Sequence, residues 1–332
     1  MSNNLKAPFP YFGGKSKVSG AVWTRLGVVD TYVEPFAGSL AVLLGRPAPV
    51  VGSETVNDWS CLLINAWRSI QKDPDGLAEL LVGPVSEVDT EAQHWALVAN
   101  AKKLRDALGN PDAFDTKLAA YYIRGANEWI GSGWAAEEGE GPWSWSLDNG
   151  WQKRARGGNS GTGINRKLPH LGDSGKGINR QLPHLGDSGT GQYEERVAWV
   201  SSWLLALKDR LCRVRISCGD FERVLSPSVT TKHGTVGVFI DPPYDGTEYV
   251  YGTDVPVSLR VRNWCLENGV NPSFRIVVAG RGTEHDSLLQ GGWSKEVWTA
   301  NRGYSGGDNN ARREEALWIS PFCVSSAISA AA

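Results

Sequence analysis

The sequence has few cysteines, no long apolar run and almost no net charge, and each shortage argues against a class of protein. Its five cysteines are scattered and form no Cys-x-x-Cys pair, so we expect buried thiols in a reducing compartment rather than disulfides or a zinc site. No signal peptide is recognised and no apolar run could span a bilayer, which predicts a soluble cytoplasmic protein without a membrane partner. The net charge of -2 argues against binding to nucleic acid by overall charge, so any such surface must be local.

The 332 residues are enough for one catalytic domain with a sizeable insertion. A β-prone run at 31–34 is broken at Pro35, and a short helical stretch at about 40–45 leads to a second strand from Pro49 to about Asp58. This strand–turn–helix–strand order is typical of a parallel sheet. From about residue 60 to 135, apolar residues recur at intervals of three and four, which predicts helices.

Residues 135–192 are rich in Gly, Ser, Trp and Arg without periodicity, and we expect a loop there. The stretch contains a duplication: residues 163–175 recur as 177–189, with Gln181 in place of Lys167. Two copies are too few for a solenoid, so we interpret them as a duplicated loop. After it we expect a helix at 193–210 and then strands at 213–218, 236–240, 274–279, 295–299 and 316–319.

The sharpest chemical signal is Asp241-Pro242-Pro243-Tyr244, directly after the apolar run 236–240. That run has no polar alternation, as in a central parallel strand, and ligands of such sheets bind at the carboxyl ends of the strands. The Asp241 carboxylate and the Pro242 carbonyl could hold the two hydrogens of an exocyclic base amine. The prolines keep the loop rigid, and Tyr244 offers a face for an extruded base. A strand stop with a tyrosine at the rim is the plainer alternative.

Other motifs also follow strands. Glu34-Pro35-Phe36-Ala37-Gly38 is a turn whose glycine lets the backbone approach a nucleoside-type ligand. Asp58 comes 20 residues after Gly38, a spacing typical of a carboxylate that binds ribose hydroxyls, although it would also suit a helix cap. In Gly219-Asp220-Phe221, Asp220 could accept from an adenine amine while Phe221 packs on the ring, or the pair could be a cap and a core residue. Lys15 follows a Gly-Gly turn that suits a carboxylate or phosphate.

Together these motifs resemble the Dam-like class of DNA adenine-N6 methyltransferases, which bacteria and phages often carry. The resemblance covers most of the chain. It rests on five motifs in the order typical of that class: Tyr11 to Lys15, Glu34 to Gly38, Asn57-Asp58, Gly219 to Phe221 and Asp241 to Tyr244. One departure is Ser39, where members of the class often have a second glycine in the first turn.

The resemblance implies a fold and a division into domains. The fold would be α/β, a Rossmann-like S-adenosylmethionine-dependent methyltransferase sheet, mostly parallel with an antiparallel last strand. A helical and loop-rich target-recognition domain would interrupt it. The catalytic domain would comprise residues 1–60 and 193–322 and the insertion residues 61–192, while the small-residue tail 323–332 is expected to be disordered.

The resemblance also implies the chemistry. The cofactor would be S-adenosylmethionine, without a metal, and the enzyme would act in a bacterial host cell. The implied catalytic residues are Asp241, Pro242, Pro243 and Tyr244. The implied cofactor-binding residues are Tyr11, Lys15, Glu34, Pro35, Phe36, Gly38, Asp58, Asp220, Phe221 and Asp241. No Pro-Cys nucleophile of the cytosine-C5 type is present, so we expect direct transfer without a covalent bond between enzyme and base.

Double-stranded DNA is the expected partner, and the segment 151–191 supplies the local charge that the whole chain lacks. It has an excess of about five positive charges. Arg166 and Arg180 occupy the same place in the two repeats and are expected to meet phosphates or guanine edges, with a solvated linker as the alternative. His170 and His184 have no Cys or carboxylate at ligand spacing, which disfavours a metal pair. The candidate DNA contacts are Arg124, Lys153, Arg154, Arg156, Arg166 and Arg180.

Three other functions stay open. Methylation of cytosine N4 would use the same two acceptors, but Asp rather than Ser before Pro-Pro, together with the motif order, favours adenine. A DNA-binding protein that keeps the fold without activity is the second, and the intact Asp58, Asp220 and Asp241 argue against it. RNA or a small metabolite as methyl acceptor is the third, which the basic insertion disfavours. The oligomeric state is not predicted, and a monomer would be compatible with the sequence.

Overall fold

The computed structural model describes residues 5–11, 15–84, 86–110, 112–129, 134–135, 143–146, 150–153, 193–243, 255–299 and 314–325. The chain divides into two compact units. One unit, which we call the sheet unit, consists of Lys15–Trp59 and Arg213–Ala332. The other, the helical unit, consists of Met1–Gly14 and Ser60–Cys212, so most of it lies in sequence between the two parts of the sheet unit.

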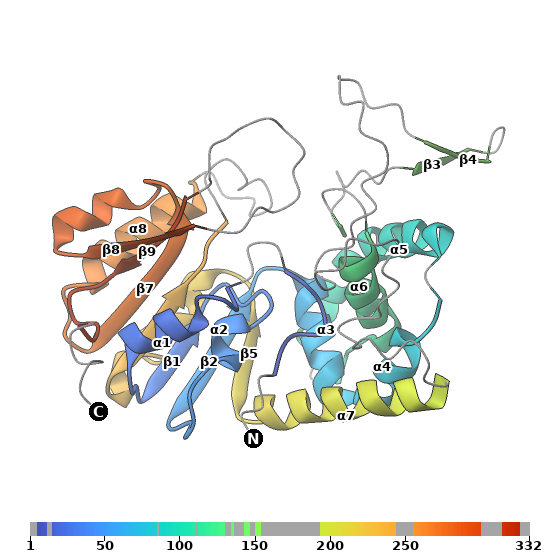
Figure 1. Cartoon of the computed structure of the whole chain (residues 1–332), viewed down its shortest axis with the longest axis horizontal. Helices are drawn as coiled ribbons and strands as arrows, with labels where there is room; N and C mark the ends of the chain where they lie inside the picture. Colours follow the sequence, from blue (N-terminus) through green and yellow to red (C-terminus); the bar gives the residue numbers. More distant parts are fainter. Residues whose placement is uncertain are drawn as a thin grey trace. The chain divides into compact units, whose positions relative to one another are not determined.

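The sheet unit is built on a seven-stranded sheet with the strand order β5-β2-β1-β6-β7-β9-β8 (Figure 1). The first five strands in this order pair in parallel, and β9 runs antiparallel to both of its neighbours. The predicted α/β architecture, a mostly parallel sheet with an antiparallel last strand, is therefore confirmed. The strands are β1 (Thr31–Glu34), β2 (Ser53–Asp58), β5 (Val214–Cys218), β6 (Val236–Ile240), β7 (Phe274–Arg281), β8 (Ser294–Thr299) and β9 (Glu314–Ile319).

Strand β6 shows why this sheet is covered on both faces. Its sequence Val-Gly-Val-Phe-Ile is buried throughout, and alternate residues of a strand point to opposite faces. Val236, Val238 and Ile240 belong to one core cluster with Val257, Val261 and Cys265 of helix α8 (Val257–Asn268). On the other face, a Cβ added at Gly237 would meet the side chains of Val29 and Leu26, at the end of helix α1 (Ser19–Leu26).

Helices α1 and α8 are not predicted by the sequence patterns described above. Their N-caps, Val18 and Pro256, make no side-chain capping hydrogen bond, so neither N-cap position holds the Ser, Thr, Asp or Asn that marks a helix start in sequence. Packing against the sheet, rather than a local signal, therefore defines both helices.

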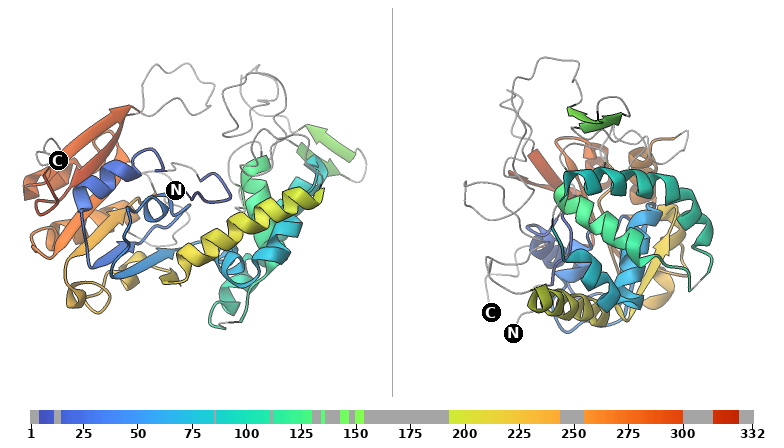
Figure 2. Two further views of the ribbon diagram at one scale, coloured as in Figure 1. Left: turned by 60° about the horizontal axis from the view of Figure 1, so that its bottom comes forward. Right: turned by 90° about the vertical axis from the view of Figure 1, so that its right-hand side faces the viewer.

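The helical unit confirms the helices expected between residues 60 and 135, and each described start has a side-chain cap. Ser60, Asp73, Ser86 and Asp115 accept hydrogen bonds from backbone N–H groups in the first turns that follow them. The helices of this unit, seen in Figure 2, are α3 (Cys61–Lys72), α4 (Pro74–Leu81), α5 (Glu87–Ala107), α6 (Thr116–Glu128) and α7 (Tyr193–Leu211). Within the described ranges, no helix combines the length and the apolar character that crossing a bilayer requires.

Helix α7, which follows the expected insertion 61–192 in sequence, belongs to the helical unit. Its apolar residues Val200, Leu204, Leu207 and Leu211 are buried, and the helix packs on α3 and α4. The Ser201 hydroxyl donates to Asp75, and the Leu211 carbonyl accepts from Gln71. The apolar positions of a helix do not show in sequence which of two cores will bury them, so the boundary expected at 193 stays a prediction.

Two further expectations are corrected. Strand β2 begins at Ser53 rather than Pro49, because Gly52, at φ +76°, forms a tight turn in which a Cβ would collide with the Asp30 carbonyl. The expected loop contains two short antiparallel strands, β3 (Trp143–Ser146) and β4 (Gly150–Lys153). At the start of the expected tail, the Val324 N–H donates to the Arg25 carbonyl on α1; residues 326–332 lie outside the described residues.

Candidate functional site

The candidate site lies at the carboxyl edge of the sheet, where the order of the strands reverses. Strand β1 pairs with β2 on one side and with β6 on the other. The chain therefore continues from β1 toward one edge of the sheet and returns beside β1 before it continues toward the opposite edge. Ligands of open α/β sheets bind at such a reversal, outside the carboxyl ends of the strands. The two segments that leave this point begin at Pro35 and Asp241.

Asp241 is held at this edge by Lys15. The Lys15 ammonium lies 2.9 Å from Asp241 Oδ1 and 3.9 Å from Glu315 Oε2, and its side chain is only 5% exposed. Arg281, the last residue of β7, pairs with Glu315 at 3.5 Å. Burial raises the pKa of Asp241, while Lys15 acts in the opposite direction. Lys15, Asp241, Glu315 and Arg281 thus form one network of charged side chains. The two carboxylates compensate the charge of the buried Lys15 ammonium, as a buried charge requires.

Two prolines directly follow Asp241 at the end of β6. Pro242 is buried and Pro243 is half-buried. Both fix their own φ, so the backbone after β6 has little freedom and the Pro242 carbonyl is held in one orientation. Tyr244 lies outside the described residues, so its position beside this edge stays a prediction.

Glu34, expected among the cofactor-binding residues, is buried inside the sheet unit. Its Oε2 accepts from the Tyr32 hydroxyl at 3.0 Å and from the Leu43 N–H, in the short helix α2 (Ala41–Leu44), at 3.2 Å. Burial raises the pKa of Glu34 from its ordinary value of 4.5 to about 8. These contacts give Glu34 a role in fixing the turn after β1. Contact with a cofactor stays a prediction.

The turn after β1 is tied to the ends of β2 and β5 by Asn57. Its Nδ2 donates to the Pro35 carbonyl at 3.1 Å and to the Gly219 carbonyl at 2.8 Å. The backbone carbonyl of Asn57 accepts from the Ala37 N–H. The sequence motif Asn57-Asp58 includes this residue, but the sequence patterns predict no role for it. An amide next to the acidic residue at a strand end was the only available signal.

Asp58 and Gly38 form the next contact of this edge. The Gly38 N–H donates to Asp58 Oδ2 at 3.1 Å, and Gly38 adopts a φ of +47°, which favours glycine. Asp58 is buried, and the cap of the following helix is Ser60, so the capping alternative for Asp58 is wrong. The buried Oδ1 of Asn57 has no hydrogen-bond partner among the described residues, which is typical of a position where water or a ligand completes the bonding.

Asp220 and Phe221 make the contacts of a cap and a core residue. Asp220 Oδ1 accepts from the Glu222 N–H, at the start of the 3-10 helix η1 (Phe221–Val224), and Arg260 binds both carboxylate oxygens. Phe221 is buried and stacks on Phe36, with ring centres 5.3 Å apart. The structural alternative is therefore present for both residues, and their contact with a cofactor adenine is not tested by these contacts.

The other candidate residues lie in the helical unit or outside the described residues. Tyr11 belongs to the helical unit and is 39% exposed. Arg124 pairs with Glu128 at 3.2 Å and donates to the Pro84 carbonyl, so it joins α6 to the segment before α5. Lys153 ends strand β4. The structure does not describe Arg154, Arg156, Arg166 and Arg180. DNA contact by these residues stays a prediction.

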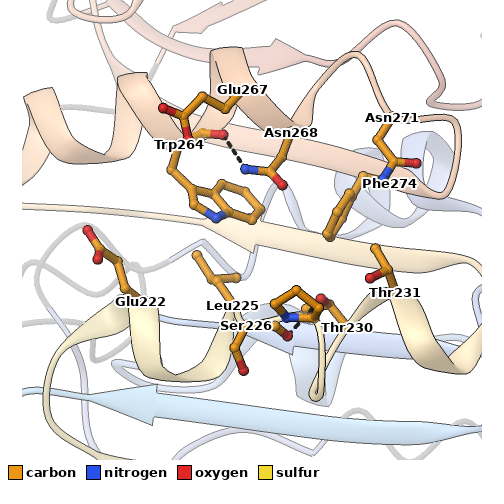
Figure 3. A pocket seen from close by; sticks show the side chains of 11 residues that line it. Glu222, Leu225, Ser226, Thr230, Thr231, Trp264, Glu267, Asn268, Asn271 and Phe274 are labelled. Carbon is orange, nitrogen blue, oxygen red and sulfur yellow. Dashed lines mark hydrogen bonds between the residues drawn. The ribbon is translucent and has the colours of Figure 1, made fainter.

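A cavity of about 390 Å³ lies elsewhere in the sheet unit (Figure 3). Trp264 and Phe274 line it on one side, and Leu225, Ser226 and Thr230 line it on the other. Its volume is in the range of small-molecule sites, but it contains none of the candidate site residues. In the described part of the chain, no three His, Cys, Asp or Glu side chains converge as metal ligands would.

Comparisons with known proteins add no assignment. No protein-family model matches the chain, and no curated protein matches it.

Proposed function

We propose that the chain is a DNA methyltransferase that transfers a methyl group from S-adenosylmethionine to an exocyclic base amine, with adenine N6 as the acceptor. The observation that carries this proposal is the place of Asp241-Pro242-Pro243. The motif begins at the carboxyl end of β6, beside the end of β1, where the strand order reverses. Lys15, from the Tyr11-to-Lys15 motif, pairs with Asp241 at this point. Two motifs far apart in sequence thus meet at one site.

The residues at the edge fit the chemistry of a nucleoside cofactor. Asp58 and Asp220 are acceptors for hydroxyl and amine donors, and Gly38 allows close approach of the backbone. Phe36 and Phe221 provide an apolar surface. The buried Oδ1 atom of Asn57, which has no partner among the described residues, would supply one more acceptor. When bound, S-adenosylmethionine would supply an electrophilic methyl group.

Asp241 and Pro242 would act on the amine of the target base. Lys15 donates to Asp241 Oδ1, and among the described residues none is seen to donate to Oδ2, which would serve as an acceptor. Oδ2 and the Pro242 carbonyl would each accept one N–H of the amine and turn its nitrogen lone pair toward the methyl group. The nitrogen would gain the methyl group as the carbon–sulfur bond of the cofactor breaks, and S-adenosylhomocysteine would leave. The nitrogen would release one proton to water, and no bond would form between enzyme and base. A base inside a duplex is out of reach, so the target must be extruded.

The helical unit is proposed as the target-recognition domain. In support, its residues 60–212 separate the two sequence segments of the sheet unit, and its segment 151–191 carries the locally basic sequence. Double-stranded DNA is the proposed partner, and a bacterial cytoplasm, for a bacterial or phage protein, the proposed location.

The function can be tested by incubating the protein with S-adenosylmethionine and unmethylated plasmid DNA and analysing the nucleosides by mass spectrometry. We expect N6-methyladenine. N4-methylcytosine would support the closest alternative, which uses the same acceptors. Methylation of RNA in place of DNA would contradict the proposed substrate, and binding of DNA without any methyl transfer would favour an inactive DNA-binding relative.

A further inference from the structure

Arg260, on helix α8, makes an unusually complete set of contacts with the segment that follows β5. Its Nη1 donates to Asp220 Oδ2 at 2.8 Å, and its Nη2 donates to Asp220 Oδ1 at 3.0 Å. Nη2 also lies 2.7 Å from a carboxylate oxygen of Glu222, to which Nε donates at 3.1 Å. The guanidinium carbon lies 4.9 Å from the centre of the Phe221 ring. This bidentate, stacked arrangement needs the planar fork of arginine.

The contacts of Asp220 leave one acceptor position unused. A carboxylate has about four lone-pair positions, two on each oxygen. Oδ1 accepts from Arg260 Nη2 and from the Glu222 N–H, whereas Oδ2 accepts only from Arg260 Nη1. One position on Oδ2 therefore has no donor among the described residues. The Asp220 side chain is 33% exposed, so a donor from outside the protein can reach it.

The charge of Asp220 makes this position an acceptor and not a donor. Partial burial raises the pKa of Asp220, but the hydrogen bonds from Arg260 and from the Glu222 N–H outweigh burial and hold the pKa below its usual range. Asp220 is therefore ionised at neutral pH. The exocyclic amine of a purine donates a hydrogen bond and therefore suits the ionised Oδ2. A purine carbonyl at the same position is an acceptor, so no hydrogen bond could form between it and Oδ2.

We infer that Arg260 is a positioning residue that fixes the Asp220 carboxylate, so that Oδ2 accepts from the exocyclic amine of a purine nucleoside ligand and selects it over a 6-oxo purine. The inference rests on the proposed function, because the purine in question is that of the cofactor. Asp220 is fixed by two hydrogen bonds from Arg260 and one from the Glu222 N–H. It directly precedes Phe221, whose ring stacks on Phe36 of the turn after β1. Lysine at position 260 would supply the charge without the fork.

The test compares the binding of S-adenosylhomocysteine with that of its 6-oxo analogue, S-inosylhomocysteine, by calorimetry. The wild-type protein is expected to prefer the amine by about 10- to 100-fold, the range for a hydrogen bond to a charged group. In Arg260→Met, this preference should fall below about threefold, while the affinity for the 6-oxo compound changes little. Arg262→Met, on the same helix, removes an arginine that donates to the Glu284 carbonyl and should keep the full preference.

The outcomes separate the inference from the proposed function. Wild-type protein that binds both compounds equally, or Arg260→Met that keeps the full preference, overturns the inference while the methyltransferase proposal stands. Wild-type protein that binds neither compound contradicts the proposed function itself. If Arg260→Met does not fold, Arg260→Lys serves instead. Its preference for the amine, expressed as a ratio of affinities, should be smaller than the square root of the wild-type ratio. A preference unchanged in Arg260→Lys would also overturn the inference.

Discussion

At the scale of single residues, the site depends on carboxyl groups whose surroundings give them different charges. Asp220 is held ionised by Arg260, whereas Glu34 is buried and has a pKa raised to about 8. The two residues come from motifs that look equally acidic in sequence. The fold sets the burial and the hydrogen-bond partners of each carboxyl group. As a result, Asp220 is an anion at neutral pH, whereas Glu34 carries a proton.

Glu34 therefore predicts a pH dependence of stability. Between about pH 4.5 and 8 the folded protein keeps a proton on Glu34 that the unfolded chain has released. Stability from this group is fully present below pH 4.5 and is lost as the pH rises to about 8, with a slope of up to about 1.4 kcal/mol per pH unit. Urea unfolding of Glu34→Gln should lack this slope. The exposed Glu267→Gln is the control, and equal slopes in wild type and Glu34→Gln would contradict the account.

At the scale of elements, three strand ends are held together by one amide. Asn57 donates to carbonyls in the segments after β1 and β5, and its own segment ends β2. Asn57→Ala should remove both donors and cost about 1–3 kcal/mol for each carbonyl left without a partner. The measurement is the free energy of unfolding in urea. Asn268→Ala, whose amide bonds within its own helix, is the matched control. Equal stability of the two variants would show that the strand ends hold together without this amide.

The sequence predicts elements where local signals and tertiary packing agree. Strand β6 occurs at the predicted residues because five consecutive apolar residues before Asp-Pro-Pro leave few alternatives. Helix α8 is not predicted because Pro256 gives no capping signal. That omission conceals Arg260, and with it the partner of Asp220, which lies 40 residues away in sequence. The motif residues could be found from sequence, but the contacts that give them their charge and orientation could not.

At the scale of the whole molecule, the proposed DNA binding would need a local surface, because the chain is nearly neutral. Arg166 and Arg180 lie at equivalent positions of the duplicated segment, which falls outside the described residues. Each arginine that meets a phosphate releases about one counterion. The double variant Arg166→Ala and Arg180→Ala should therefore flatten the slope of log affinity against log salt by up to about two units. Cofactor affinity should not change. A salt titration with an unchanged slope and unchanged base preference would mean that the repeat is a linker.

The proposed function predicts a separation of tasks between the two units. Asp241, Lys15, Asp58 and Asp220 all belong to the sheet unit, whereas the basic segment 151–191 lies in sequence between α6 and α7 of the helical unit. Variants of the first group should therefore change methyl transfer or cofactor binding, and variants of the second should change DNA affinity. The central claim concerns the first group, and within it Asp241.

The most direct test measures the transfer of a labelled methyl group to plasmid DNA by Asp241→Ala in a single turnover. Loss of the acceptor that holds the target amine should slow transfer by at least about a hundredfold, while the melting temperature shows that the variant is folded. Asp106→Ala, which removes an exposed partner of Lys102, should transfer at the wild-type rate. A folded Asp241→Ala protein that methylates DNA at nearly the wild-type rate would contradict the account, because no other described acidic side chain follows β6 at this edge.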